Sequence, residues 1–470
     1  MKRFIFLLLF CASPVLAKTW LVGPTRSYTA PSKVANLVAD GDTVLVDSGL
    51  YTGDVATWNA NDLVLRCPNG MARFNANGNI AGLKGIWLFY GKNAYVEGFE
   101  FYGAQISAAD GDNGAGIRVQ GNNFTCRRCY FHDNQEGILT GNDTNSNNIL
   151  IEACAFDHNG VETGGAAGYE HNIYIGLCSR CTITFCYFHA SIVGHEVKCR
   201  ANRSYILYNY IVDGPTGDGS YSVDIPQGGR AFVIGNIIEK GPMAQNSTAI
   251  IYGEEGFKNP DTGFYFVNNT LVSDRNPTTF FSIASGTPVA LIANNIIAGN
   301  GHPIAGFTDT VGNVINPDTS FFHFADPQHY DYHVKNFPGF TNAATLPPVD
   351  GFSLMPASEY VDPEDSMPRI AVPQVGAFDY SAGSQSVTGI NALPTVHNFP
   401  NPFSIQTVFP NSMGSLKLFN ACGTEIPVRY SETKEGIVLE RSDLADGIYF
   451  YRISDVEHGT IAQGSVVITN

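Results

Sequence analysis

A short repeated frame in the middle of the chain limits the choice of fold more than any other feature of this 470-residue sequence. Each copy reads as a short apolar strand, one fixed residue, an apolar pair, and then Gly, Asn or Asp, as in LIEACAFDHN, YILYNYIVDG and FVIGNIIEKG. The copies recur roughly every 23 to 33 residues, which indicates that the strands keep their register while the turns vary in length. Because one unit cannot bury its apolar face alone, successive units are expected to stack.

The fixed residue of the frame is predicted to form a ladder inside the stack. This position is occupied in turn by Gly98, Cys129, Cys154, Cys186, Asn209, Asn236, Asn269 and Asn294. Stacked strands lie about 4.8 Å apart, so consecutive Asn amides can hydrogen-bond along the axis, and the Cys thiols fill the same slot as apolar spacers. The pattern predicts an all-β chain folded as a right-handed parallel β-helix solenoid.

The cysteines also allow two other interpretations. The C-x-x-C pairs Cys126/Cys129 and Cys178/Cys181 have the spacing of zinc ligands. A disulfide among Cys126, Cys178 and Cys181 is the second alternative in an exported chain. Burial as spacers is the preferred interpretation, because the ladder already accounts for Cys129.

Composition restricts the partners of the chain. Lys and Arg total 27 against 43 Asp and Glu, which gives a formal net charge of −16. Such a surface repels nucleic acid and anionic membranes, so no nucleic-acid partner is expected and a polyanion would need a local basic patch. Beyond the N-terminus, no stretch reaches the roughly 18 apolar residues that a transmembrane segment requires.

The two ends of the chain carry different signals. Lys2 and Arg3, the apolar run 5–10 and the small residues before Lys18 predict a signal peptide over residues 1–17. Ser32–Val38 is expected to form a short N-terminal cap helix. The expected order is then a β-helix over 18–310, an irregular segment that packs on the helix with a linker over 311–388, and a small β-sandwich domain over 389–470.

Motifs in the last domain resemble the type IX secretion sorting domain of Bacteroidota. They are NFPNPF within 397–403, the turn at Gly423, and LADGIYFYRI over 444–453. The resemblance implies export by the type IX secretion machinery, through the periplasm, to the cell surface or the medium.

Other strings resemble extracellular β-helix families. GDTVLVDSGLY over 41–51 is similar to the opening coil of pectin-lyase-like proteins. GAGIRVQG, EHNIYIG, GHEVKCRA and YSVDIPQGG resemble a group of extracellular right-handed β-helix proteins. The resemblance implies the fold and a polysaccharide partner, but it implies no particular reaction, and the motifs of polygalacturonases and mannuronan epimerases are absent.

The second strand of each coil predicts a candidate site. These strands align on inward residues Ile117, Ile138, Ile173, Val197, Val223 and Ile251. Since side chains alternate along a strand, the next residue faces outward, which gives the column Arg118, Leu139, Tyr174, Lys198, Asp224 and Tyr252. A second outward column contains Arg200 and Glu254, and His171, Asn172, His195 and Glu196 begin their strands.

This face favours a polysaccharide lyase that cleaves a uronate-containing glycan by β-elimination. Lys198 is the predicted base, with Arg200 as a neighbouring like charge that favours the neutral amine, and Tyr174 or His195 is the predicted acid. Asp224 completes the catalytic set. Arg118, Arg200, His171, Asn172 and Tyr252 are the predicted substrate-binding residues. Glu196, Asp224 and Glu254 are the predicted ligands of a Ca²⁺ ion.

Several alternatives stay open at this point. Asp224 and Glu254 are expected about 8 Å apart, within the range of about 6.5–9.5 Å for an inverting glycoside hydrolase. A non-catalytic glycan-binding or adhesive surface protein is the other functional alternative, with a monomer expected in each case. Lys198 and Asp224 could form a mere surface ion pair, and His171 and His195 could only bond the strand starts. Glu170 and Glu255 are interpreted as solvated turn residues.

Overall fold

The computed structural model describes residues 17–142, 147–162, 167–302, 309–335, 343–369 and 374–379, followed by parts of 405–468. The predicted signal peptide up to residue 16, residues 380–388 of the predicted irregular segment with its linker, the NFPNPF motif and Gly423 lie outside the described residues. The chain divides into two compact units, Met1–Ala382 and Gly383–Asn470. Each unit is described by itself.

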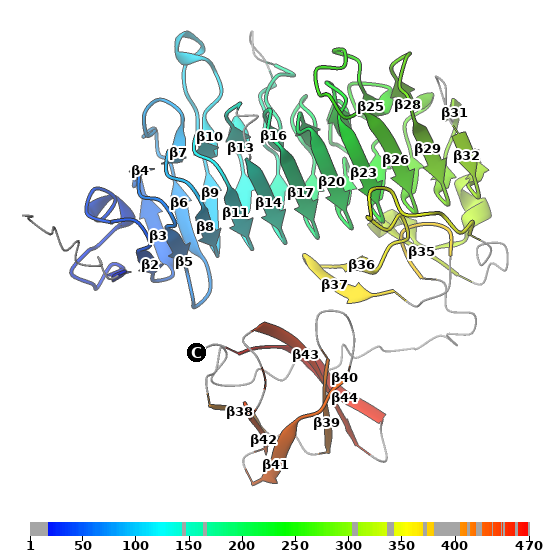
Figure 1. The fold of residues 1–470 in the computed structure, drawn as a ribbon. Helices are drawn as coiled ribbons and strands as arrows, with labels where there is room; N and C mark the ends of the chain where they lie inside the picture. The colour runs from blue at the N-terminus through cyan, green and yellow to red at the C-terminus, as the bar shows by residue number, and fades with distance from the viewer. Residues whose placement is uncertain are drawn as a thin grey trace, which may run out of the picture. The chain divides into compact units, whose positions relative to one another are not determined.

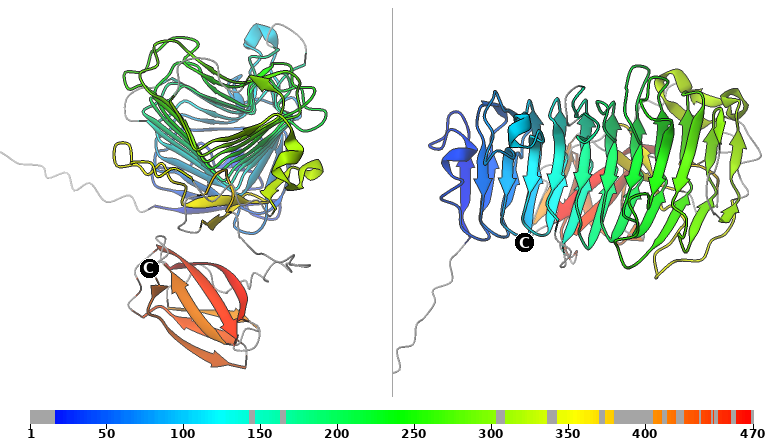
Figure 2. Two further views of the ribbon diagram at one scale, coloured as in Figure 1. Left: turned by 90° about the vertical axis from the view of Figure 1, so that its right-hand side faces the viewer. Right: turned by 90° about the horizontal axis from the view of Figure 1, so that it is seen from above.

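The first unit is a parallel β-helix built from three long parallel sheets (Figure 1). One coil runs through β11 (Phe124–Arg127) of the 12-stranded first sheet, β12 (Tyr130–His132) of the 11-stranded second sheet and β13 (Glu136–Thr140) of the 10-stranded third sheet. The chain then returns to the first sheet as β14 (Asn148–Glu152), which pairs in parallel with β11. Figure 2 shows the stacked coils end-on and from above. The predicted β-helix fold is therefore confirmed.

Stacked aromatic rings fill the interior of the first coils. Phe74, Phe101, Phe131, Phe156 and Phe188 are fully buried, one on each successive coil. Their ring centroids are 5.5, 5.4, 5.0 and 4.8 Å apart along the stack. Each ring thus meets the next in the offset geometry that aromatic pairs prefer, which adds to the free energy gained from burial.

The predicted ladder is confirmed from Cys129 to Asn269 and corrected at both ends. At the first end, Tyr130 pairs with Glu100, so Phe99 and not Gly98 lies opposite Cys129. Gly98, with φ 84°, makes the turn before Phe99. Asn209, Asn236 and Asn269 are fully buried and hydrogen-bonded to one another in sequence. The next member is Asn295, not Asn294, because Asn269 Nδ2 donates to Asn295 Oδ1 at 3.2 Å. Asn294 has φ 57° and makes the turn before it, a conformation that Asn tolerates better than most residues. With two Asn in a row, the sequence did not distinguish the turn from the ladder.

The cysteines of the described residues are buried free thiols. They are Cys67, Cys126, Cys129, Cys154, Cys178, Cys181, Cys186 and Cys199. Cys154 Sγ lies 3.8 Å from Cys126 Sγ, and Cys186 N donates to Asn209 Oδ1 where the Cys part of the ladder meets the Asn part. The spacer interpretation is confirmed for the ladder positions Cys129, Cys154 and Cys186.

The two ends of the solenoid differ from expectation. The first strand is β1 (Thr19–Val22), which pairs with β2 (Thr43–Val46), so a coil precedes the expected opening strand. The predicted cap helix over 32–38 is wrong, since only a single 3₁₀ turn, η1 (Pro31–Lys33), forms there. At the other end, β32 (Asp309–Val311) and β33 (Val314–Asn316) continue the sheets beyond residue 310. Val375, Ala377 and Phe378 pack on Ile237 and Ile296 of the last coils.

The second unit contains two small antiparallel sheets. The three-stranded sheet consists of β38 (Gln406–Pro410), β42 (Gly436–Glu440) and β41 (Arg429–Thr433). The four-stranded sheet consists of β40 (Glu425–Ile426), β39 (Ser415–Phe419), β43 (Gly447–Asp455) and β44 (Gly459–Ile468). Phe409, Leu418 and Tyr451 contribute to its own buried core. In the described part of the chain, no helix has the length and apolar character needed to span a membrane.

Candidate functional site

The outer face of the third sheet brings three predicted residues side by side. Tyr174 of β16 (Ile173–Ile175) pairs with Lys198 of β19 (Val197–Cys199), which pairs with Asp224 of β22 (Val223–Ile225). Arg118 of β10 (Ala115–Val119) lies in the same column, separated from Tyr174 by Leu139. We call this surface the third-sheet face.

Lys198 and Asp224 form a buried pair at the centre of this face. Lys198 Nζ lies 3.7 Å from Asp224 Oδ2, and the two side chains are only 9% and 5% exposed. Burial raises the pKa of Asp224 to about 6, although the charge of Lys198 opposes that rise. Asp224 Oδ1 has no hydrogen-bond partner among the described residues. The interpretation as a surface ion pair is therefore wrong, because both side chains are buried.

Two stacked histidines border the pair. The rings of His171 and His195 lie 4.4 Å apart, and burial lowers the pKa of both well below the usual value. His171 Nδ1 accepts a hydrogen bond from His195 N, and His195 Nδ1 accepts one from Tyr221 N. Each neutral ring therefore carries its proton on Nε2. His195 Nε2 points to Asp224 Oδ2 at 3.3 Å, whereas His171 Nε2 has no partner in the described part.

Arg200 is occupied by neighbouring side chains. Its Nε donates to the Tyr174 hydroxyl at 2.8 Å, and its two terminal nitrogens bind both carboxylate oxygens of Glu255. The hydrogen bond and charge of Arg200 lower the pKa of Glu255. Glu255 is an exposed turn residue, as expected, but it also forms an ion pair with Arg200. One expectation is corrected: Arg200 does not present a free fork to a substrate carboxylate. Its contacts instead hold the Tyr174 ring in place.

Arg118 is the unpaired cation of the face. Its Nε and Nη1 are buried without a hydrogen-bond partner among the described residues, and burial lowers its pKa. Glu136, the largest charge acting on it, is itself buried with a raised pKa. Glu170 was expected to be solvated, but it is buried, its pKa is raised by burial to about 7, and its Oε2 has no described partner.

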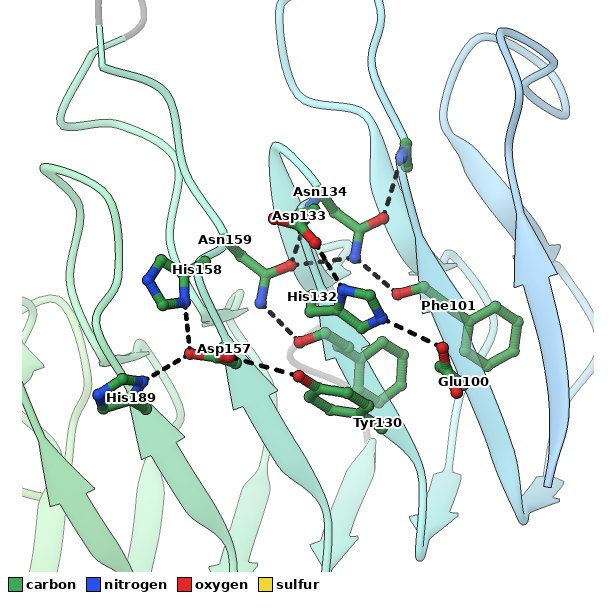
Figure 3. Close-up of polar contacts among 12 residues, drawn as sticks. Glu100, Phe101, Tyr130, His132, Asp133, Asn134, Asp157, His158, Asn159 and His189 are labelled. Atoms are coloured by element: carbon green, nitrogen blue, oxygen red, sulfur yellow. Dashed lines mark hydrogen bonds and ion pairs between the residues drawn. The ribbon is translucent and has the colours of Figure 1, made fainter. Parts of the chain in front are cut away.

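Asn172 and Glu196 do not belong to the exposed face. They end a second buried ladder, in which Asn134, Asn159, Asn172 and Glu196 are linked by side-chain hydrogen bonds. Figure 3 shows the Asn134–Asn159 part of this ladder, where Asn159 Nδ2 also donates to a backbone carbonyl. The inward–outward alternation of side chains along a strand does not apply to Asn172 and Glu196, because both residues lie at the corner where the chain enters the third sheet. The Asn after each of FHD, FDH and YEH was the sequence signal for this ladder.

The register of β25 (Thr248–Tyr252) removes two further candidates. Val223 pairs with Ile250 and Asp224 with Ile251, so Ile251 takes the outward place predicted for Tyr252. Tyr252 is fully buried and donates to Gly229 O. Glu254 lies in the turn beyond, where it accepts a hydrogen bond from Ser282.

The predicted Ca²⁺ ligand set is therefore wrong as a set. Glu196 is buried at the corner, Asp224 lies on the face, and Glu254 lies in an exposed turn. Among the described residues, the group of acidic and imidazole side chains close enough to share an ion lies on the second sheet instead.

Comparisons with known proteins add little beyond the fold. No protein-family model matches the sequence. The search of curated proteins also gave no significant match. Among solved structures, pectate lyase Pel9A is similar, with a TM-score of 0.48 and 12% sequence identity over 77% of this chain and 96% of that chain. A likeness this distant carries no argument about activity.

Proposed function

We propose that the third-sheet face binds an acidic glycan and that the protein is a secreted polysaccharide lyase. The observation that supports the proposal is a group of buried polar atoms without described partners: Arg118 Nε and Nη1, Glu170 Oε2, His171 Nε2 and Asp224 Oδ1. Each such atom costs about 1–3 kcal/mol while it stays unpaired. A ligand rich in hydroxyls and carboxylates would satisfy donors and acceptors together, and a carboxylate suits the Arg118 fork.

The proposed chemistry is β-elimination. Lys198 acts in its unprotonated form, so the ammonium that pairs with Asp224 in the resting protein first releases its proton to solvent. The free amine then takes the proton from the carbon next to the uronate carboxylate, a carbon–carbon double bond forms, and the glycosidic carbon–oxygen bond at the β-carbon breaks. The Tyr174 hydroxyl, whose pKa burial raises, supplies a proton to the leaving oxygen. His195, the other predicted acid, is a neutral ring that would have to become an imidazolate, so it is not assigned this step. Asp224 orients Lys198 and His195, and Arg200 positions Tyr174.

The proposed site of this activity is outside the cell. We infer export from the predicted signal peptide over residues 1–17 and from the sorting-domain motifs near the C-terminus. A glycan lyase acting on a large polymer must reach its substrate outside the cell, so the two inferences agree.

A substrate panel tests the proposal directly. The mature protein is mixed with pectate, alginate and glucuronan, with and without Ca²⁺, while ultraviolet absorbance follows the unsaturated uronate product. Rising absorbance with one polymer is the expected result. New reducing ends without absorbance would show hydrolysis instead, and binding without new ends would leave a non-catalytic glycan-binding protein.

Removal of the Arg118 guanidinium should weaken substrate binding. Arg118→Ala is expected to raise KM about tenfold or more, because the variant loses the charge-assisted pair between the guanidinium and a substrate carboxylate. The change in kcat should be smaller, because Arg118 lies away from the reacting Lys198. Arg118→Lys should recover little, since a lysine lacks the bidentate fork. Steady-state kinetics on the best polymer measure both constants. An unchanged KM would remove Arg118 from the substrate site.

A further inference from the structure

The outer face of the second sheet holds a separate cluster of two histidines and an aspartate (Figure 3). Asp157 is the last residue of β15 (Ala155–Asp157), and His189 is the last residue of β18 (Tyr187–His189). The two strands pair in parallel with Asp157 opposite His189. His158 follows Asp157 with φ 49°, and this left-handed turn directs its ring back to the same point.

The donor atoms of the three side chains converge. Asp157 Oδ1 lies 2.6 Å from His158 Nδ1 and 2.7 Å from His189 Nδ1. One ligand atom from each residue lies within 4.8 Å of the other two. The side chains of Asp157, His158 and His189 are 26%, 48% and 27% exposed, so an ion can reach them from solvent.

The neighbouring coil supports a bound cation. Tyr130 OH donates to the second carboxylate oxygen, Asp157 Oδ2, at 3.3 Å, which is the type of outer contact that orients a metal ligand. On the preceding coil, His132 contacts Asp133 and Glu100. The carboxylates of Glu100, Asp133 and Asp157 therefore lie among the histidines of these neighbouring coils, and their charge favours a cation.

We propose that Asp157, His158 and His189 bind one divalent transition-metal ion of the zinc type. Two imidazoles and one carboxylate suit zinc and its neighbours, whereas Ca²⁺ prefers an all-oxygen shell. Ligand atoms in a tetrahedral zinc site lie about 3.3 Å apart, so the two Asp157–His contacts, at 2.6 and 2.7 Å, must open by about 0.6–0.7 Å. The ion would join the ends of β15 and β18 and leave a position for water or a ligand oxygen. This proposal does not depend on the third-sheet face.

Zinc binding by the full mature chain tests the site. After EDTA treatment and desalting, ZnCl₂ is titrated by calorimetry and the thermal midpoint is measured with and without zinc. The wild type should bind one equivalent and melt at a higher temperature, because the ion binds the folded state. Asp157→Asn and His189→Ala should each weaken binding about tenfold or more. CaCl₂ should neither bind at this cluster nor compete.

His132→Ala is the matched control, since it removes a histidine one coil away and should leave zinc affinity unchanged. His158→Gln, at the most exposed ligand, serves as a second variant if His189→Ala fails to fold. The proposal is overturned if the wild type binds no zinc, or if the ligand variants bind it as tightly as the wild type. Equal losses in His132→Ala and the ligand variants would also overturn the assignment.

Discussion

Replacing Lys198 with Ala is expected to reduce glycan elimination by about a thousandfold, the contribution expected of a general base. The loss should appear in kcat, because the amine acts on the reacting carbon. The measurement is the rate of unsaturated product at saturating polymer. Lys92→Ala is the matched control, since Lys92 is an exposed lysine elsewhere on the solenoid and its loss should leave the rate unchanged.

The same variant should also lose stability, because Lys198 is buried against Asp224. Without the ammonium, Asp224 is a buried carboxylate with no cation in contact, at a cost of about 1–3 kcal/mol at neutral pH. Burial already raises the pKa of Asp224 to about 6, so its protonated form dominates below that pH and no longer uses the ion pair. The stability loss should therefore be full near pH 8 and shrink by pH 5.

A second substitution separates the two effects. Lys198→Ala combined with Asp224→Asn removes both charges and should recover most of the thermal midpoint without recovering activity. Wild-type activity in the single Lys198→Ala variant would exclude Lys198 as the base. Activity that returns together with stability in the double variant would assign Lys198 a structural role only.

The fold could be predicted from the sequence because each coil repeats the same physical requirement. A position that must be apolar, or must hold an amide, recurs once per coil, and the spacing of strands converts that recurrence into a ladder. The prediction failed where the pattern was degenerate. Ile250 and Ile251 satisfy the inward position equally well, and so do Asn294 and Asn295 at the ladder, so only tertiary packing selects between them.

The candidate site could be predicted only along the strands. Tyr174, Lys198 and Asp224 were placed together because strand alternation fixes their direction. Glu255 was missed as the partner of Arg200 because it reaches back from a turn 55 residues later in the chain. The conformation of the turns does not follow the repeat, so the sequence pattern does not predict it. The predictions for Asn172 and Glu196 failed for the same reason, because both residues lie at a corner of the coil.

Among the interior features, the Asn ladder is the one whose disruption should lower the free energy of unfolding most for the number of atoms removed. Asn236 Oδ1 accepts from Asn209 N and Nδ2, and Asn236 Nδ2 donates to Ile206 O and Asn269 Oδ1, each at 2.9 Å. Asn236→Ala removes these four hydrogen bonds in a fully buried place. Asn209 N loses its acceptor, whereas Asn209 Nδ2 keeps Ile183 O and Asn269 Oδ1 keeps the backbone Asn236 N. We expect the free energy of unfolding to fall by about 3 kcal/mol or more.

Urea titration followed by circular dichroism measures this loss as a shift of the midpoint. Asn300→Ala is the matched control, because Asn300 is exposed and its side chain bonds only Asn276 in the described part, so the change in the free energy of unfolding should stay within about 0.5 kcal/mol. Since each coil is stabilised mainly by its neighbours, a broken ladder step should also separate the unfolding of the two flanking halves and broaden the transition. An Asn236→Ala midpoint equal to that of Asn300→Ala would mean that water or a backbone shift satisfies the groups that lose their partners, and that coil stacking depends on the apolar core alone.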